Sequence, residues 1–468
     1  MPKNKIIILG TGPCGLGAAW RLQELKHKNF KIFEKLSYPG GLASSFIDEK
    51  GFTWDIGGHI QFSHYKYFDE LMDYLLKDEW LKHERESWVW IRDRFVPYPF
   101  QNNIRHLPKE DMWECLSGII GLYRDSHKKP ENFKEWIIAT FGHGISKIFL
   151  LPYNYKVWAY PPEQLSYNWI GERVSVPDLK RITENILFNQ DDLSWGPNNT
   201  FRFPLRGGTG RIWKKLYDKI DNKALFGHEA IELNTSRKYV KFNNGHIEHF
   251  DYLISTIPLD KLISISDLND KSAASELMHS SVHIFGIGMK GSPPEHLKKK
   301  CWMYFPEDDC PFYRATVFSN YSHFNVPDIE NYWSLMVEVS ESPDKIVDHS
   351  SIEEGVIQGL INTKLIPSKG AIVDFWHHFE PYGYPTPSLQ RDDALKILPI
   401  LGDLGIFSRG RFGGWKYEVS NQDHTFMQGV EAVNRILLNQ EEITIWHPEE
   451  VNKPDSRLKL ERSIFEQN

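Results

Sequence analysis

The N-terminal segment joins a short apolar run, a glycine-rich turn and apolar residues at helical spacing. In KIIILGTGPCGLGAAWRLQEL, Gly10, Gly12 and Gly15 fit the pattern G-x-G-x-x-G, and Gly17 leaves room for close helix packing. FKIFEK is then expected to form a second short strand that ends at Glu34. This is the spacing at which a dinucleotide-binding fold places the acid that binds ribose. The order of strand, turn, helix and strand predicts a dinucleotide-binding unit at the start of the chain.

In two later regions of the chain, apolar residues recur at two different spacings. Between about residues 105 and 195, apolar residues recur at the spacing of helices. Between about 280 and 380 they alternate with polar ones, as in FYRATVFS, which places Arg314 on one face with Phe312 and Phe318. A bare charge on such a face is costly unless it is paired, so Arg314 is expected to have an anionic partner. These patterns predict a helical region followed by an antiparallel sheet.

The last periodic segment, NQDHTFMQGVEAVNRILL, predicts a helix. Asp423 is its expected N-cap, and Phe426, Val430 and Val433 form its apolar stripe. We find no internal repeat, low-complexity segment or long linker in the sequence. We therefore expect domains that are interleaved along the chain rather than arranged one after another.

Composition narrows the functional class. The chain has 468 residues, 41% of them hydrophobic, which is enough for two or three domains. Its formal net charge of −7 argues against a nucleic-acid partner. It has no stretch of about 18 apolar residues, and its first apolar run is too short for a signal peptide, so we expect a cytoplasmic protein without a membrane segment. The four cysteines show no CxxC or zinc-ligand spacing, which predicts free thiols and no metal site.

Further glycine pairs favour FAD over NAD. Gly40 and Gly41 of YPGGLASS come directly after the ribose acid, an arrangement typical of flavin amine-oxidase-like proteins, in which backbone amides meet the pyrophosphate. Late in the chain, GRFGGWKYEVSNQDHTF is a glycine-rich turn that leads into a helix. The N-terminus of such a helix would favour reduced, electron-rich flavin.

The segment DIGGHIQFSHYKYF is rich in glycine and aromatic residues. Gly57 and Gly58 precede His59, and closely spaced aromatic residues follow. Glycine pairs allow another molecule to approach the backbone, because no Cβ is in the way. Flavin amine-oxidase-like proteins line the isoalloxazine at this spacing, so the resemblance to them implies a wall of the flavin pocket that includes the aromatic residues from Phe62 to Phe68.

Several longer motifs extend from the first strand to about residue 440. They include GGHIQFSHYKYFDEL, VPYPFQNNI, PYNYKVWAY, WGPNNTFRFPLRGGTGRIW, CWMYFPEDDCPFYRATVFSNYS and SRGRFGGWKYEVSNQDHTFMQGVEAV. With these motifs the chain resembles the UDP-galactopyranose mutase family, in its eukaryotic (fungal-like) type, over nearly its whole length.

The resemblance implies a flavin-dependent isomerase that interconverts UDP-galactopyranose and UDP-galactofuranose without net redox change. In this family N5 of reduced FAD attacks the anomeric carbon and UDP leaves. The sugar ring opens, O4 recloses in place of O5, and UDP returns. The product supplies galactofuranose for glycans such as those of cell walls. The implied partner is a UDP-sugar, and homo-oligomer formation is left open.

The functional positions of the family fall on particular residues of this chain. The implied catalytic residues are His59 beside the flavin, Arg173 and Arg314 at the diphosphate, and Asn198 near the sugar. The implied substrate-binding residues are Phe62, Tyr98, Phe100, Gln101, Asn154, Trp158, Arg173, Asn198, Trp302, Tyr304, Arg314, Tyr384, Tyr417 and Asn421. The implied FAD-binding residues are Gly10, Gly12, Gly15, Glu34, Gly40, Gly41, Leu42, Gly57, Gly58, His59, Arg411, Asn421, Gln422 and Asp423.

Two further expectations follow from the same resemblance. NADPH, the reductant in eukaryotic-type members, is expected at Arg85, Ser87, Arg411 and His424, since a 2′-phosphate favours arginine. The segments GERVSVP and SWGPNNT match mobile loops of the family, whose closure would exclude water from the reacting sugar.

The predicted fold class is α/β, with an FAD-binding Rossmann-like domain interleaved with a helical domain and an antiparallel β-sheet domain. The FAD-binding domain is expected at 1–84, 200–279 and 391–440, the sheet domain at 85–104 and 280–390, the helical domain with its substrate loops at 105–199, and a C-terminal tail at 441–468.

Three alternatives stay open. A redox enzyme of amine-oxidase, desaturase or protoporphyrinogen-oxidase type would share the FAD motifs, but it has no use for two arginines and several tyrosines around a diphosphate. An inactive flavoprotein scaffold is disfavoured by the intact GGH motif, Arg173 and Arg314. The same ring contraction on UDP-N-acetylgalactosamine, a deoxy-galactose nucleotide or an arabinopyranose nucleotide depends on a few contacts that the sequence does not place. The choice between NADPH and NADH is open as well.

Overall fold

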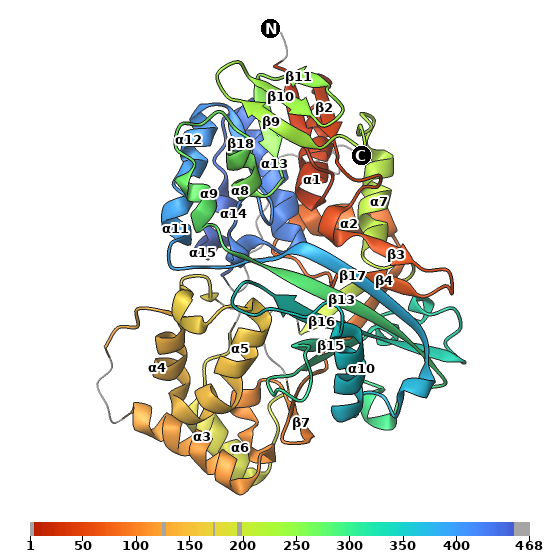
Figure 1. Ribbon diagram of the computed structural model, residues 1–468, viewed down its shortest axis with the longest axis vertical. Coiled ribbons are helices and arrows are strands. Elements are labelled where there is room, and N and C mark those ends of the chain that lie inside the picture. The colour runs from red at the N-terminus through yellow and green to blue at the C-terminus, as the bar shows by residue number, and fades with distance from the viewer. Residues whose placement is uncertain (1–3, 124–127, 172–173, 194–198, 454–468) are drawn as a thin grey trace.

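The computed structural model describes residues 4–123, 128–171, 174–193 and 199–453. Its upper part in Figure 1 is built on a parallel sheet with the strand order β18-β12-β1-β2. The strands are β1 (Ile6–Leu9), β2 (Phe30–Phe33), β12 (Tyr252–Ser255) and β18 (Ile406–Ser408). Ile6 and Ile8 of β1 face one hydrophobic core and Ile7 faces another, so the strand is buried on both sides, as is typical of a parallel sheet.

Helix α1 (Pro13–Glu24) packs closely on helix α13 (Gln422–Leu438). A Cβ on Gly17 would lie 2.3 Å from the carbonyl oxygen of Phe426, and one on Gly429 would lie 2.0 Å from that of Cys14. Only glycine fits on either side of this crossing. The close helix packing predicted for Gly17 is therefore confirmed.

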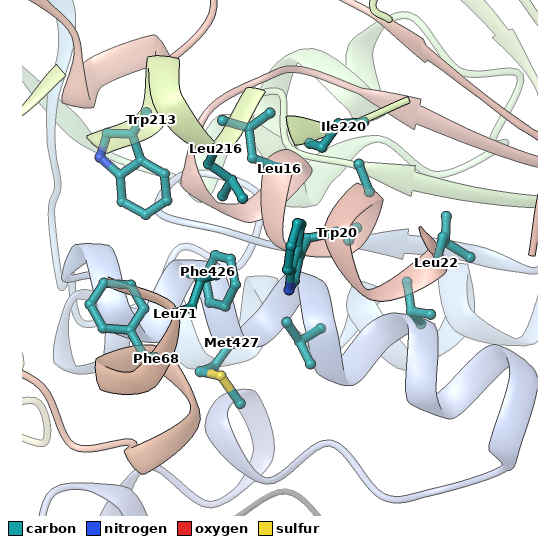
Figure 2. Packing of buried hydrophobic residues seen from close by; sticks show 14 of the residues in the cluster. Leu16, Trp20, Leu22, Phe68, Leu71, Trp213, Leu216, Ile220, Phe426 and Met427 are labelled. Carbon is teal, nitrogen blue, oxygen red and sulfur yellow. The ribbon is translucent and has the colours of Figure 1, made fainter. Parts of the chain in front are cut away.

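A hydrophobic core lies around this helix pair (Figure 2). Helix α1 contributes Leu16 and Trp20, and helix α13 contributes Phe426. Two further helices, α2 (Lys66–Leu76) and α7 (Gly210–Lys219), close the core with Phe68 and Trp213, respectively. The core fixes α13, whose N-terminus faces the functional site described below.

The aromatic run after His59 does not line a pocket along its whole length, as the sequence suggested. Tyr65, Tyr67 and Phe68 are buried in the core shown in Figure 2. The ring centroid of Phe68 lies 5.5 Å from that of Phe426 and 6.3 Å from that of Trp213. The segment enters helix α2 here, and the amphipathic character of that helix directs these rings into the core rather than toward a ligand.

A seven-stranded sheet crosses the middle of the molecule (Figure 1), with the order β17-β13-β16-β15-β14-β6-β7. The strands are β6 (Ser87–Ile91), β7 (Arg94–Pro97), β13 (His279–Lys290), β14 (Trp302–Tyr304), β15 (Arg314–Val317), β16 (Tyr332–Glu341) and β17 (Ile372–Pro385). Neighbouring strands are antiparallel except β14 and β6, which pair in parallel. The predicted antiparallel sheet is thus a mixed one, because β6 and β7 come from an earlier part of the chain.

A group of helices lies to the lower left in Figure 1. These helices are α3 (Lys109–Leu122), α4 (Phe133–Ile145), α5 (Leu151–Trp158) and α6 (Leu179–Phe188). Helices α3 and α4 cross closely, since a Cβ on Gly142 would lie 2.4 Å from the carbonyl carbon of Gly118. Their core includes Phe141, Phe149 and Trp158, and Trp158 brings helix α5 to the edge of the functional site.

The remaining elements connect these three regions. The short strands are β3 (Ser45–Ile47), β4 (Thr53–Asp55), β5 (Trp80–Glu84), β8 (Thr200–Pro204), β9 (Ala230–Asn234), β10 (Tyr239–Phe242) and β11 (Ile247–His249). The other helices are α8 (Leu259–Ser264), α9 (Ser272–Glu276), α10 (Ile352–Asn362), α11 (Arg391–Ala394), α12 (Ile397–Asp403), α14 (Ile443–Trp446) and α15 (Pro448–Val451). Strand β5 precedes the helical region in the sequence and pairs with β8, which follows it, so the regions are interleaved along the chain. The exact domain limits stay a prediction.

Two sequence-based expectations concern the chain as a whole. Among the described residues, no helix is both long and apolar enough to cross a membrane. The cysteines Cys14, Cys115, Cys301 and Cys310 are buried and free, as their spacing predicted.

Candidate functional site

A cavity of about 1080 Å³ lies where the parallel sheet, the seven-stranded sheet and the helical region meet. Its wall includes Gly12 from the turn after β1, Ile284 from β13 and Trp158 from α5. Ligand pockets commonly measure about 300–1,000 Å³. This cavity is therefore as large as the largest common ligand pockets.

The two glycine turns meet at one end of the cavity. A Cβ on Gly41 would lie 3.3 Å from the Cα of Gly12, whereas a Cβ on Gly12 would meet only the carbonyl oxygen of Gly40, at 3.9 Å. Gly12 therefore presents its open side to the cavity. Gly15 has a different reason to be glycine, because its Cβ would lie 2.0 Å from the carbonyl oxygen of Gly10. One glycine leaves space for a ligand, and the other allows the turn itself to close.

Glu34 lies on the wall beside these turns, at the end of β2. Its Oε2 accepts hydrogen bonds from the backbone amide and the hydroxyl of Thr11, both at 2.8 Å. Its Oε1 accepts one from the amide of Leu36 at 2.9 Å. These bonds hold the carboxylate at the position from which a dinucleotide-binding fold contacts ribose.

The N-terminus of helix α13 also faces the cavity, through Asn421, Gln422 and Asp423. The N-cap is Asn421, so the prediction of Asp423 as N-cap is wrong. Asp423 lies inside the first turn, where its Oδ2 accepts from the backbone amide and Nδ1 of His64 at 3.1 and 2.9 Å. Burial opposes ionisation of Asp423, but His424 and His64 together hold its pKa below the ordinary value. The side chain of Asp423 thus binds a distant segment instead of capping its own helix.

The GGH motif forms part of the cavity wall. Gly57 has a φ of +96°, which favours glycine, and the amide of Gly58 donates to Oε1 of Glu338 at 2.9 Å. Nδ1 of His59 is buried and has no hydrogen-bond partner among the described residues. Burial lowers the pKa of His59 to about 4, so the ring is neutral at physiological pH. The motif therefore presents a rigid backbone and an unsatisfied polar atom to the cavity.

Arg314 is paired with an anionic side chain of the chain itself, so its position on the strand does not by itself require an anionic ligand. That partner is Glu338, which stands opposite Arg314 in the register of β15 and β16. Its carboxylate accepts from Nε at 3.0 Å and from Nη2 at 2.6 and 2.7 Å, and also from the hydroxyl of Tyr313 at 2.5 Å. Burial opposes ionisation of Glu338, but the charge of Arg314 and the hydrogen bonds from Tyr313, Arg314 and Gly58 together outweigh it and lower the pKa of the carboxyl. Sequence reasoning missed Glu338, although it is an isolated acid in the apolar run YWSLMVEVS.

A group of aromatic rings forms another part of the cavity wall. Trp158 contacts Tyr417 and Tyr384, with ring centroids 4.8 and 5.8 Å apart. Tyr304 lies 5.4 Å from Tyr98 and from Tyr153, a cavity residue that the sequence did not single out. Desolvation raises the pKa of Tyr98, Tyr153 and Tyr384, so these hydroxyls stay protonated and can donate hydrogen bonds.

Arg85 and Arg411 also line the cavity. Arg85 donates to the hydroxyls of Ser87 and Tyr304, both at 2.8 Å, and its guanidinium lies 4.9 Å from the ring centroid of Trp302. It is not a solvated surface charge, although Glu84 and Glu86 flank it in the sequence. Arg411 donates to the carbonyl oxygen of Gly383 and to the hydroxyl of Ser420, both at 3.0 Å.

The structure brings most of the predicted site residues to this one cavity. Those that line it are Gly10, Gly12, Glu34, Gly41, Leu42, Gly57, Gly58, His59, Phe62, Arg85, Tyr98, Gln101, Asn154, Trp158, Trp302, Tyr304, Arg314, Tyr384, Arg411, Tyr417, Asn421, Gln422 and Asp423. Those that do not line it are Gly15, Gly40, Ser87, Phe100 and His424. Arg173 and Asn198, with much of the two predicted mobile loops, lie outside the described residues.

Known proteins resemble this chain in both sequence and structure. Residues 8–75 match a family model described as an NAD(P)-binding Rossmann-like domain. A solved structure described as reduced UDP-galactopyranose mutase is 47% identical, with a TM-score of 0.96, and the match covers 98% of this chain and 100% of that one.

More distant structures show the fold alone. A putative protoporphyrinogen oxidase from Exiguobacterium sp. 255-15 is 15% identical, with a TM-score of 0.72 and coverage of 94% of this chain and 100% of that one. A CLA-producing fatty acid isomerase from P. acnes is 13% identical, with a TM-score of 0.65 and coverage of 93% and 99%. Only the 47% identical protein combines the fold with substantial identity over the whole length among these three. This chain is therefore an enzyme that belongs to the UDP-galactopyranose mutase family.

Proposed function

We propose that this chain interconverts UDP-galactopyranose and UDP-galactofuranose, with reduced FAD as its resident cofactor. The observation that carries the proposal is that one cavity joins two binding chemistries. At one end are the glycine turns and Glu34, which suit a dinucleotide. At the other are Arg314 and a group of tyrosines, which suit a nucleoside diphosphate sugar.

Three features of the cavity fit FAD. Gly12 leaves space for a pyrophosphate, and the N-terminus of α13 is a place where a helix stabilises negative charge. His59 presents an unsatisfied Nδ1, as a neutral imidazole suited to a hydrogen bond with the flavin ring. When bound, reduced FAD would supply N5 as the nucleophile for the anomeric carbon.

The polypeptide would fix the position of that ring. The amide of Gly58 already donates to Glu338, so the backbone from Gly57 to His59 is set before any ligand binds. The same carboxylate orients Arg314 and Tyr313. Glu338 thus connects the proposed flavin wall to the proposed diphosphate site and would keep their relative position fixed.

Arg314 is proposed to hold the departing diphosphate. Its Nε and Nη2 are bonded to Glu338, while Nη1 has no hydrogen-bond partner among the described residues and can donate to phosphate oxygens. Because Glu338 neutralises this arginine, the diphosphate needs further cations. Arg173 is proposed as the main one, and Arg85 and Arg411 line the same cavity.

Uncharged groups would complete the substrate site. Hydroxyls of tyrosines are proposed to bind the diphosphate without adding charge, and the uridine is proposed to lie among the aromatic and amide side chains from the helical side. The residues proposed at the diphosphate are Tyr304, Tyr384 and Tyr417, and those proposed at the uridine are Tyr98, Gln101, Asn154 and Trp158. Phe100 does not line the cavity, but its ring packs on Phe149, which does, with centroids 4.7 Å apart. The residues proposed near the sugar and flavin are Phe62, Trp302, Asn198 and Asn421.

NADPH is proposed as the source of electrons, with Arg85 and Arg411 as its contacts. Ser87 and His424 do not line the cavity, so we propose indirect roles for them. Ser87 accepts a hydrogen bond from Nε of Arg85, and His424 stacks on His64 with centroids 4.6 Å apart. Both would orient a residue that lines the cavity rather than contact the reductant.

The deciding experiment supplies UDP-galactofuranose to the dithionite-reduced, FAD-loaded protein and separates the nucleotide sugars by chromatography. We expect UDP-galactopyranose from the reduced protein, almost none from the oxidised protein, and a loss of most turnover in Arg314→Ala with FAD retained. Equal turnover by the fully oxidised protein would exclude N5 as the nucleophile. Oxygen consumption with an amine, without mutase activity, would favour a redox enzyme instead.

A further inference from the structure

A cluster of histidine and glutamate side chains lies on the face of the seven-stranded sheet that points away from the cavity. His283 on β13 is flanked in sequence by Val282 and Ile284, both of which line the cavity. Successive side chains of a strand point to opposite faces, so His283 faces the other side. Glu341 of β16 and His377 of β17 join it there, because Ser281 pairs with Glu341 and Phe285 with His377 in the sheet register.

The cluster brings three ligand-type atoms together. Nε2 of His283 lies 2.9 Å from Oε2 of Glu341, and Nε2 of His349, from the segment after β16, lies 2.8 Å from the same oxygen. All three atoms lie within 4.8 Å of one another. The side chain of His283 is 0% exposed, that of Glu341 19% and that of His349 55%, so the group is anchored in the sheet and open on one side.

His377 supports this group from behind. Its Nε2 lies 3.0 Å from Nδ1 of His283, and its own Nδ1 lies 3.8 Å from Oε1 of Glu353, in the first turn of α10. Metal-binding histidines commonly use their second ring nitrogen in this way, because the contact fixes the tautomer and the ring orientation.

The local charge favours a cation. Glu341, Glu353 and Asp348 surround the histidines, and Lys345 is the basic side chain that acts on His283. Nζ of Lys345 donates to the backbone carbonyl of Ser340 at the end of β16. These three acidic side chains outnumber Lys345 among the charged groups named here.

We propose that Nε2 of His283, Nε2 of His349 and the carboxylate of Glu341 bind one Zn²⁺-type dication, with water in the remaining position. Two imidazoles and one carboxylate form a common three-ligand set for zinc, with ligand bonds of about 2.0–2.2 Å. On binding, each ligating imidazole carries its single proton on Nδ1. The proton of His283 then points to Nε2 of His377, whose own proton lies on Nδ1 toward Glu353.

Such a metal would tie together two parts of the enzyme. The segment that carries His349 also contacts the helical region, since the backbone carbonyl oxygen of Asp344 accepts from the hydroxyl of Tyr155 at 2.8 Å, and its Oδ2 accepts from Nε2 of Gln164 at 2.7 Å. The metal would fix one end of this segment to the sheet. We therefore expect it to raise thermal stability without taking part in the sugar chemistry.

The test uses tag-free, flavin-loaded protein that has been treated with a chelator and then dialysed. Calorimetric titration with Zn²⁺ is compared for wild type, His349→Ala, His377→Ala and, as a control, His323→Ala, which removes an exposed histidine outside the cluster. We expect one site per chain in wild type and in the control. We expect that site to be lost in His349→Ala and its affinity to fall roughly 10–100-fold in His377→Ala.

Thermal unfolding provides a second readout that does not depend on activity. Zn²⁺ should raise the unfolding temperature of wild type and of His323→Ala but not that of His349→Ala, because only a ligand of the folded state stabilises it. Mutase turnover should be the same in all four proteins. Identical Zn²⁺ titrations for wild type and His349→Ala, or the absence of a site in wild type, would overturn the proposal.

Discussion

Replacing Glu338 by glutamine should destabilise the protein in the absence of ligands. In the wild type its carboxylate accepts hydrogen bonds from Arg314, Tyr313 and the amide of Gly58. Glu338→Gln keeps the shape of the side chain but removes the charge. It also turns one acceptor into an NH2 group, which must face groups that are themselves donors. The guanidinium of Arg314 is then left without its counter-charge.

The magnitude follows from how deeply the pair is buried. The side chains of Arg314 and Glu338 are 19% and 5% exposed. Removal of one partner of a buried pair costs about 3–5 kcal/mol, because the other charge stays in a poorly solvated place. Glutamine can still accept one of the hydrogen bonds, so we expect a loss near the lower end of that range. A matched control is Glu307→Gln, which breaks a more exposed pair with Arg92, for which about 0.2–1 kcal/mol is expected.

The assay is urea unfolding with and without UDP. A diphosphate can replace the missing charge beside Arg314, so UDP should stabilise Glu338→Gln more than wild type. Arg314 holds the pKa of Glu338 below its ordinary value of 4.5. The difference in the free energy of unfolding between wild type and Glu338→Gln should therefore be fully present above pH 4.5. It should shrink as the pH falls through the lower pKa of Glu338 in the folded state. Unchanged stability of Glu338→Gln, together with an equal effect of UDP on both proteins, would refute this account of Arg314.

Three further predictions can be tested separately. Gly12→Ala should lose FAD, measured by flavin absorbance, yet unfold like wild type, whereas Gly15→Ala should be destabilised even without FAD because its Cβ meets a backbone oxygen. Burial raises the pKa of Glu431 from 4.5 to about 8, so between these pH values the folded state keeps a proton that the unfolded state has lost. The free energy of unfolding should therefore fall as the pH rises across this range. Urea unfolding at several pH values should show that fall in wild type but not in Glu431→Gln. Changing both Arg85 and Arg411 to alanine should slow stopped-flow bleaching of the flavin by NADPH but not by dithionite, and equal bleaching by NADPH would place the reductant elsewhere.

Local patterns in the sequence determined the dinucleotide-binding unit. The order of strand, turn, helix and strand was enough to predict it. Gly15 and Gly17 are required by the turn itself and by one helix crossing, and Gly12 leaves open space beside the turn. The same holds for the helical region and for most of the long sheet. In these segments the period of apolar residues dictates the element that can bury them.

Tertiary structure alone decided which side chains meet. Glu338 pairs with Arg314 only through the register of two strands, and Asp423 binds His64 instead of capping its own helix. The His283 cluster combines residues from three strands and the segment after one of them, with no spacing that could reveal it. Periodicity specifies the face of an element but not its partner across space, since the partner depends on register and packing between segments far apart in the chain.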